Sequence, residues 1–229
     1  MRNNQVVLGA LGKGKNTFVF PEMKEFYNVN TVLMGYAATG KTQTLRYLIE
    51  GSLCKNKKIL LLDFFNENME FTNNINGENV SVGQIERLCE TKANFINLYF
   101  AKDRYFEKSY LDAIYDILYK LPADLYKLNI DYLVIDEGQR LISPNYLDIF
   151  LEILEIVNGC GIHIILSVQN LYEEWNELTK TFPYKVIFND TFRYPEIHQI
   201  TDCLPRGHSI LIDSKNKPLY AIRPTAFKH

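Results

Sequence analysis

The feature that most constrains this chain is the segment Gly35-Tyr-Ala-Ala-Thr-Gly-Lys-Thr42. It follows the short apolar run Thr31–Met34, and apolar residues at helical spacing come after it (Leu45, Leu48 and Ile49). A strand, a glycine-rich loop and a helix in this order direct several backbone N–H groups at one point, where they can bind phosphate oxygens. The pattern therefore predicts a P-loop that binds a nucleoside triphosphate.

Each part of this loop has an expected role. The glycines allow the backbone to approach phosphate closely. Lys41 is expected to reach the β- and γ-phosphates, and the Thr42 hydroxyl is expected to ligate Mg²⁺. The candidate nucleotide-binding residues are Gly35, Tyr36, Ala37, Ala38, Thr39, Gly40, Lys41, Thr42 and Gln43.

A second signal is the segment Leu133-Val-Ile-Asp-Glu137, an apolar run that ends in two acids. Asp136 is expected to hold a water on Mg²⁺. Glu137 is placed to polarise an attacking water, which favours hydrolysis of ATP over transfer to a small molecule. The absence of an N-K-x-D signature also argues against GTP. The alternative is an ordinary strand end with two solvated acids.

The third candidate is Gln169, which follows the apolar run Gly161–Val168. The carboxyl ends of parallel strands line the ligand crevice in α/β proteins. An amide there can contact both the γ-phosphate and the attacking water. The alternative is a surface amide that starts a loop.

Apolar runs of strand length alternate with helical patterns along the chain, which predicts an α/β fold with a mostly parallel central sheet and helices on both faces. The segment Asn66–Glu90 is polar and is expected to be mostly loop, with a short helix near Val82–Cys89. The helix after the P-loop is followed by expected helices at Tyr110–Leu121 and Asn145–Asn158. The expected strands are Gln5–Leu8, Thr17–Phe20, Thr31–Met34, Lys58–Asp63, Phe95–Phe100, Asp131–Asp136, Ile162–Val168, Lys185–Asn189, Ser209–Asp213 and Leu219–Ile222.

The 229 residues suit one domain. We expect N-terminal strands in residues 1–30, a core in 31–213, and a C-terminal strand and tail in 214–229. The formal net charge of −2 does not by itself indicate a nucleic-acid binder. The 4 cysteines form no CxxC pair, which favours buried, reduced thiols in a cytoplasmic protein. The apolar runs are too short to span a membrane, and His163 lies in one of them, as a core residue would.

Three segments in this order resemble the FtsK/HerA superfamily of DNA-pumping ATPases: GYAATGKT, LVIDEGQRLIS and GIHIILSVQN. Two weaker matches are ILLLDFFNEN, which carries Asp63 and Glu67, and LPRGHSILID. The resemblance covers roughly Thr31–Asp213. Because the chain is compact, it is most similar to the viral DNA-packaging and conjugation ATPases of that superfamily.

The resemblance implies a P-loop NTPase of the RecA-like type that hydrolyses ATP with Mg²⁺. It implies a homo-oligomeric ring, usually a hexamer, that moves double-stranded DNA, with a capsid or membrane-complex protein as a further candidate partner. Such a protein would lie in the cytoplasm, in a host cytoplasm or with a virion. Basic positions that could contact DNA are Lys102, Arg104 and Lys108.

The family often places an arginine where this chain has Asn158. An arginine from a neighbouring subunit normally stabilises the charge that develops on the γ-phosphate. Arg193 is our candidate for this role, acting in trans. Arg206 is the next candidate, ahead of Arg140, which could simply pack beside its own subunit's site.

Two other functions remain open at the level of the sequence. One is a nucleotide-dependent switch that binds a protein partner and turns over slowly, with the apolar helix Asn145–Asn158 as an interface. The other, a small-molecule kinase, is disfavoured because the few arginines are scattered. Stimulation of turnover by DNA separates the motor from both.

Overall fold

The computed structural model describes residues 29–100, 115, 118–119, 125–142, 146–169, 180–188, 208–212 and 218–222. The chain divides into two compact units: Met1–Gly51 with Leu166–His229, and Ser52–Ile165. The expected strands Gln5–Leu8 and Thr17–Phe20 lie outside the described residues. The expected helix Tyr110–Leu121 is described only at three positions, which are helical: Tyr115, Leu118 and Tyr119.

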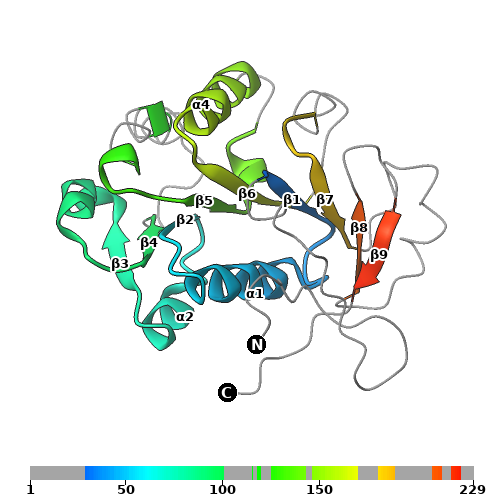
Figure 1. Cartoon of the computed structure of the whole chain (residues 1–229), viewed down its shortest axis with the longest axis horizontal. Helices are drawn as coiled ribbons and strands as arrows, with labels where there is room; N and C mark the ends of the chain where they lie inside the picture. The colour runs from blue at the N-terminus through cyan, green and yellow to red at the C-terminus, as the bar shows by residue number, and fades with distance from the viewer. Residues whose placement is uncertain are drawn as a thin grey trace. The chain divides into compact units, whose positions relative to one another are not determined.

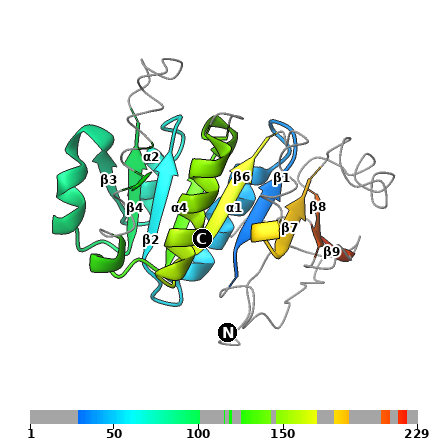
Figure 2. The same cartoon turned by 90° about the horizontal axis from the view of Figure 1, so that it is seen from above.

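The first unit is built on the strand that precedes the P-loop. Strand β1 (Thr31–Met34) is fully buried and pairs in parallel with β7 (Tyr184–Ile187). Strands β8 (Ser209–Ile212) and β9 (Pro218–Ile222) continue from β7 in antiparallel pairing (Figure 2). Helix α1 (Lys41–Leu53) follows the P-loop and buries its predicted apolar face.

The second unit has the strand order β3-β4-β2-β5-β6. Its central strands β2 (Ile59–Asp63) and β5 (Tyr132–Asp136) are buried at every residue and pair in parallel. Strand β4 (Phe95–Tyr99) lies on the other side of β2, also in parallel. Unbroken apolar runs of this kind are typical of parallel strands covered on both faces.

Two helices cover opposite faces of these strands, as Figure 1 shows. They are α2 (Met69–Asn74) and α4 (Leu147–Gly159). Strand β6 (His163–Val168) runs from this unit into the first. The fold class is therefore α/β with a mostly parallel sheet, as the sequence predicts.

The polar segment after β2 has more regular structure than we expected. The expected helical turns are present as a 3₁₀ segment at Val82–Glu90. The polar segment also contains α2 and a further parallel strand, β3 (Glu78–Ser81). Only Val80 of that strand is buried. The strand is held by its ladder with β4 and by amide side chains. Its sequence lacks the apolar alternation that predicts a strand, and for that reason it was not expected.

Two glycines mark the place where helix α4 ends and the chain turns toward β6. Helix α4 ends at Gly159, and Gly161 has φ +77°, a left-handed conformation that glycine adopts without strain.

Two apolar side chains of α4 are exposed to solvent, Ile149 at 38% and Ile156 at 37%. Among the helices of the described residues, none has the length and apolar character that a membrane crossing requires.

Two predictions about burial are wrong. Cys54 and Cys89 are exposed and Cys160 is half-buried, all as free thiols, because each lies at the end of an element rather than in its apolar face. His163 is half-buried rather than a core residue, because it is the first residue of β6. Cys203 lies outside the described residues.

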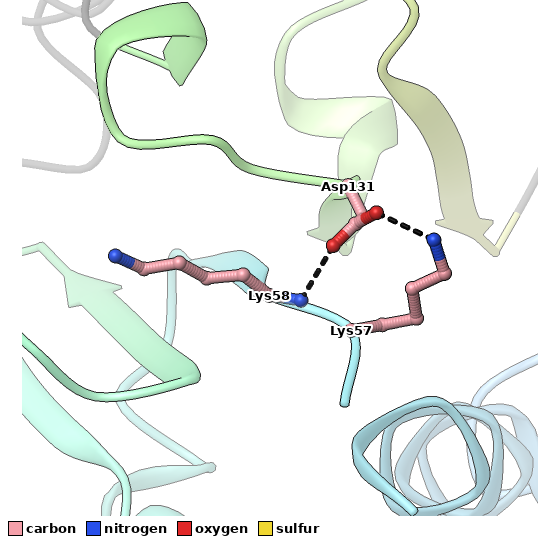
Figure 3. A network of polar contacts seen from close by, with 3 residues as sticks. All are labelled: Lys57, Lys58 and Asp131. Carbon is pink, nitrogen blue, oxygen red and sulfur yellow. Dashed lines mark hydrogen bonds and ion pairs between the residues drawn. The ribbon is translucent and has the colours of Figure 1, made fainter. Parts of the chain in front are cut away.

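An ion pair links the segments that directly precede β2 and β5 (Figure 3). Lys57 Nζ lies 2.6 Å from Asp131 Oδ1, and the backbone N–H of Lys58 donates to Asp131 Oδ2 at 2.8 Å. The N–H of His163 donates to the Asp131 carbonyl. Burial and the nearby Lys57 ammonium lower the pKa of His163, against a smaller opposite effect from Asp131.

Candidate functional site

The P-loop backbone turns through left-handed conformations, which glycine adopts without strain and other residues do not. Gly35 and Gly40 have φ of 152° and 111°, and Ala38 between them has φ 60°. The N–H of Gly35 donates to the carbonyl of Val168 at 3.3 Å, and the Thr39 hydroxyl donates to the carbonyl of Tyr36 at 2.8 Å. One hydrogen bond thus ties the first residue of the loop to the end of β6, and a second one links two residues within the loop.

Lys41 is 4% exposed although it carries a charge. Its Nζ donates to the carbonyls of Gly35 and Tyr36, each at 2.8 Å. A buried ammonium is costly unless it is hydrogen-bonded or paired with an anion. These carbonyls hold the charge inside the curve of the loop, which is where a phosphate-binding lysine is required.

The loop N–H groups meet the other requirement for a phosphate site. In the described part of the chain, the backbone N–H groups of Thr39, Gly40, Thr42 and Gln43 donate to no acceptor. Some of these are the donors that every helix leaves unpaired at its N-terminus. Together with the Lys41 ammonium they form a donor set that fits the oxygens of a nucleotide phosphate.

Asp136 is the last residue of strand β5 in the second unit, and Glu137 directly follows it. Asp136 is 3% exposed, and its Oδ1 accepts the backbone N–H of Glu137 at 3.1 Å. Glu137 adopts φ 58° and ψ 39°, which costs a non-glycine residue about 1–2 kcal/mol. Its carboxylate accepts a hydrogen bond from the Gln139 side chain. A strained backbone held by its surroundings is frequent at functional sites.

Sequence reasoning gave Asp63 no role and missed Asn68 and Asn97. Asp63 is 2% exposed and is the register partner of Asp136 on the neighbouring strand. Asn68 donates its Nδ2 to Asp136 Oδ2 at 3.4 Å, and Asn97 donates its Nδ2 to Asp63 Oδ2 at the same distance. Asp63 was part of the family resemblance. Asn68 is the last residue of the matched segment ILLLDFFNEN but was given no role there, and Asn97 lies outside every motif.

Each of the two units offers an oxygen atom of the kind that Mg²⁺ prefers. That ion prefers oxygen ligands, keeps several waters and uses one or two carboxylates with substrate phosphates. The Asp136 carboxylate and the Thr42 hydroxyl are oxygen donors of this kind. Within the described ranges no group of three or more His, Cys, Asp or Glu side chains could hold a metal ion by itself.

The remaining candidates are placed only in part. Gln169 directly follows β6 in the first unit and is half-buried, next in sequence to the Val168 carbonyl that anchors the P-loop. Asn158 lies near the end of α4, where its carbonyl accepts the Gly161 N–H at 2.8 Å. Arg140 is described only as part of a short 3₁₀ turn. Arg193 and Arg206 lie outside the described residues, as do Lys102, Arg104 and Lys108.

No family model and no curated protein sequence matches this chain. Solved structures do. The genome packaging NTPase B204 from Sulfolobus turreted icosahedral virus 2, in complex with ATP-gammaS, is 15% identical with a TM-score of 0.64, over 87% of this chain and 99% of that one. VirB4 of Thermoanaerobacter pseudethanolicus is 11% identical with a TM-score of 0.77, over 97% and 96% of the two chains.

A third match is the cytoplasmic domain of the Thermomonospora curvata Type VII Secretion ATPase EccC, which is 17% identical with a TM-score of 0.63. It covers 98% of this chain but 29% of the larger protein. At these identities the comparison concerns the fold. The chain therefore has the P-loop NTPase fold of these similar structures, as the sequence predicts.

Proposed function

We propose that this protein is a Mg²⁺-dependent ATPase motor that moves or packages double-stranded DNA as a ring of identical subunits. The observation that carries the proposal is the buried Lys41 ammonium, held inside a loop in which the backbone N–H groups of Thr39, Gly40, Thr42 and Gln43 have no acceptor in the described residues. Few functions other than phosphate binding account for a charge and free donors at the same place.

In the proposed reaction Lys41 and the loop N–H groups bind the β- and γ-phosphates, and the Thr42 hydroxyl and Asp136 hold the metal. Bound Mg²⁺ would neutralise charge on the β- and γ-phosphate oxygens. Glu137 accepts a proton from the attacking water, which forms the new bond to the γ-phosphorus as the bond to the leaving oxygen of ADP breaks. Gln169 orients that water.

The motor part of the proposal is supported by the similar structures, which include a genome packaging NTPase and a secretion ATPase. We propose double-stranded DNA as the substrate that is moved, a hexameric ring as the assembly, and a capsid or membrane-complex protein as a further partner. Arg193 of one subunit would complete the site of its neighbour. Residues 1–229 would then act as one motor domain in the cytoplasm or with a virion.

Steady-state ATP hydrolysis with and without long duplex DNA tests this function. We expect duplex DNA to stimulate the rate at low salt and the stimulation to fall steeply as salt is added, because phosphate contacts release counterions. Lys41→Ala protein is the control for contaminating ATPases. A rate that does not respond to DNA of any length at low salt contradicts the motor.

A second candidate is a nucleotide-dependent switch that binds a protein partner. The partly exposed Ile149 and Ile156 lie two turns apart on α4 and so share one face, which favours an interface there. This function predicts slow turnover that is indifferent to DNA. The DNA titration therefore separates the two candidates.

A further inference from the structure

Asn68 occupies the position at which a helix is normally capped, but its side chain does something else. Asparagine is among the residues most favoured at a helix N-cap, where its side-chain oxygen accepts a backbone N–H of the first turn. Asn68 is the N-cap residue of α2 and makes no such bond. Its Nδ2 instead donates to Asp136 Oδ2 at 3.4 Å.

The backbone of Asn68 is held on several sides. Its N–H donates to Asp63 Oδ2 at 2.9 Å, and its carbonyl accepts the N–H and the hydroxyl of Thr72 at 2.8 and 2.6 Å. The residue is 1% exposed. Its amide therefore has little freedom to turn away from Asp136.

Asp63 supplies the anchor for this arrangement. Its Oδ1 accepts the N–H of Glu67 at 3.2 Å, and its Oδ2 accepts the N–H groups of Asn68 and of the Asn97 side chain. The Asp63 carboxylate is thus engaged in fixing the turn between β2 and α2. Because Asp63 and Asp136 are register partners, this turn lies beside the end of β5.

The geometry points to Asn68 as a positioning residue for Asp136, with Asp63 holding Asn68 in place. One Asp136 oxygen accepts the Glu137 N–H and the other accepts the Asn68 amide, so the carboxylate plane is fixed from both sides. Hydrogen bonds to a metal-ligating carboxylate fix its orientation, and their loss typically lowers metal affinity or activity by about 10–100-fold. This inference rests on the proposed function, in which Asp136 holds Mg²⁺.

The test uses the full chain and three variants: Asn68→Ala, Asn68→Leu, which keeps the side-chain volume, and Asn73→Ala as the matched control. Asn73 lies on the same helix and accepts a hydrogen bond from Asn79, but the structure gives it no bond to Asp136. For each folded protein two affinities are measured: ATPγS in EDTA, and Mn²⁺ in saturating ATPγS by electron paramagnetic resonance. The rate of ATP hydrolysis is measured as a function of Mg²⁺.

We expect both Asn68 variants to bind ATPγS in EDTA as the wild type does, because the P-loop is untouched. Their affinity for Mn²⁺ should fall by about 10-fold or more, with a matching rise in the Mg²⁺ needed for half-maximal rate. Asn73→Ala should resemble the wild type throughout. If wild-type protein binds ATPγS and Mn²⁺ but a folded Asn68 variant binds Mn²⁺ equally well, the positioning role is overturned. A wild type that binds neither overturns the proposed function as well.

Discussion

At the scale of single residues, the sequence predicts the charged and glycine positions of the site but not the amides around them. Gly35, Lys41 and Asp136 belong to short sequence motifs in which each position has a known chemical role. Each of them can therefore be assigned a role from its neighbours in the sequence. Asn68 and Asn97 are neutral residues, the first in a polar segment and the second inside the apolar strand β4. Their importance depends on which strands are neighbours, and that information is spread over the whole chain.

The role of Glu137 can be tested by Glu137→Gln. Glutamine keeps the shape of the side chain and an oxygen that can accept the Gln139 hydrogen bond. It cannot take a proton from water, so we expect hydrolysis to fall by about 10²–10⁴ while ATP binding stays within about threefold, since the phosphate contacts of the loop are unchanged. Filter binding of labelled ATP and release of phosphate measure the two effects. Weakened binding with unchanged turnover per bound ATP would show that Glu137 is not the base.

At the scale of elements, prediction works where one physical signal dominates. Strands β2 and β5 are buried apolar runs, and each was predicted within about one residue of its observed bounds. The helix after the P-loop was predicted from its apolar stripe, without bounds. Helix α2 and strand β3 were missed, because they are short, polar and stabilised by hydrogen bonds to neighbours that are distant in sequence.

Gly77, in the turn between α2 and β3, gives a test of how tightly this missed region is packed. A Cβ at Gly77 would lie 2.7 Å from Phe95 Cδ1 and 3.0 Å from the Phe95 carbonyl oxygen. We expect Gly77→Ala to lower the free energy of unfolding by about 1–3 kcal/mol, as overpacking does.

The matched control for that experiment is Gly159→Ala at the end of α4. A Cβ there would meet nothing within 4 Å. Alanine has the higher helix propensity, so the free energy of unfolding should be unchanged or rise by up to about 1 kcal/mol. Urea unfolding followed by circular dichroism measures both variants. Equal effects of the two substitutions would contradict close packing around Gly77.

His163 makes a pH-dependent contribution to the stability of the folded protein. Its pKa is lowered in the folded protein by burial and by Lys57. The folded state therefore takes up a proton less readily than the unfolded state. Stability is complete above the ordinary histidine pKa of about 6.5 and is lost as the pH falls from there through the folded pKa.

We expect the free energy of unfolding of the wild type to decline between pH 7 and pH 5 more steeply than that of His163→Gln. Glutamine loses the ring contact with Tyr132, but that loss does not depend on pH. Urea titrations at several pH values give the difference between the two proteins. A difference that is constant over this range would remove His163 as the source.

At the scale of the whole molecule, the sequence predicts the fold class because strands and helices alternate, and the solved structures with the same fold agree with it. The order of the strands could not be derived in the same way. Pairings such as β1 with β7 join segments about 150 residues apart, and local patterns carry no information about them.

Mixing of subunits tests whether Arg193 acts in trans. Arg193→Ala protein should bind ATP but not hydrolyse it, because the charge on the γ-phosphate lacks its partner. Addition of Lys41→Ala subunits should restore part of the activity, since some interfaces then combine an intact P-loop with an intact arginine. Arg206→Ala serves as the comparison. Full DNA-stimulated turnover by Arg193→Ala alone would place the arginine elsewhere or exclude a ring.

The most direct test of the proposed ATPase site is the rate of ATP hydrolysis by the purified wild-type chain and by Lys41→Ala, each with Mg²⁺ and with EDTA. Lys41 lies inside the loop and its Nζ is the charge that the phosphates would meet. We expect hydrolysis only for the wild type with Mg²⁺, with Lys41→Ala folded but reduced to background. Folded Lys41→Ala protein that hydrolyses ATP at the wild-type rate would contradict the assignment of this site.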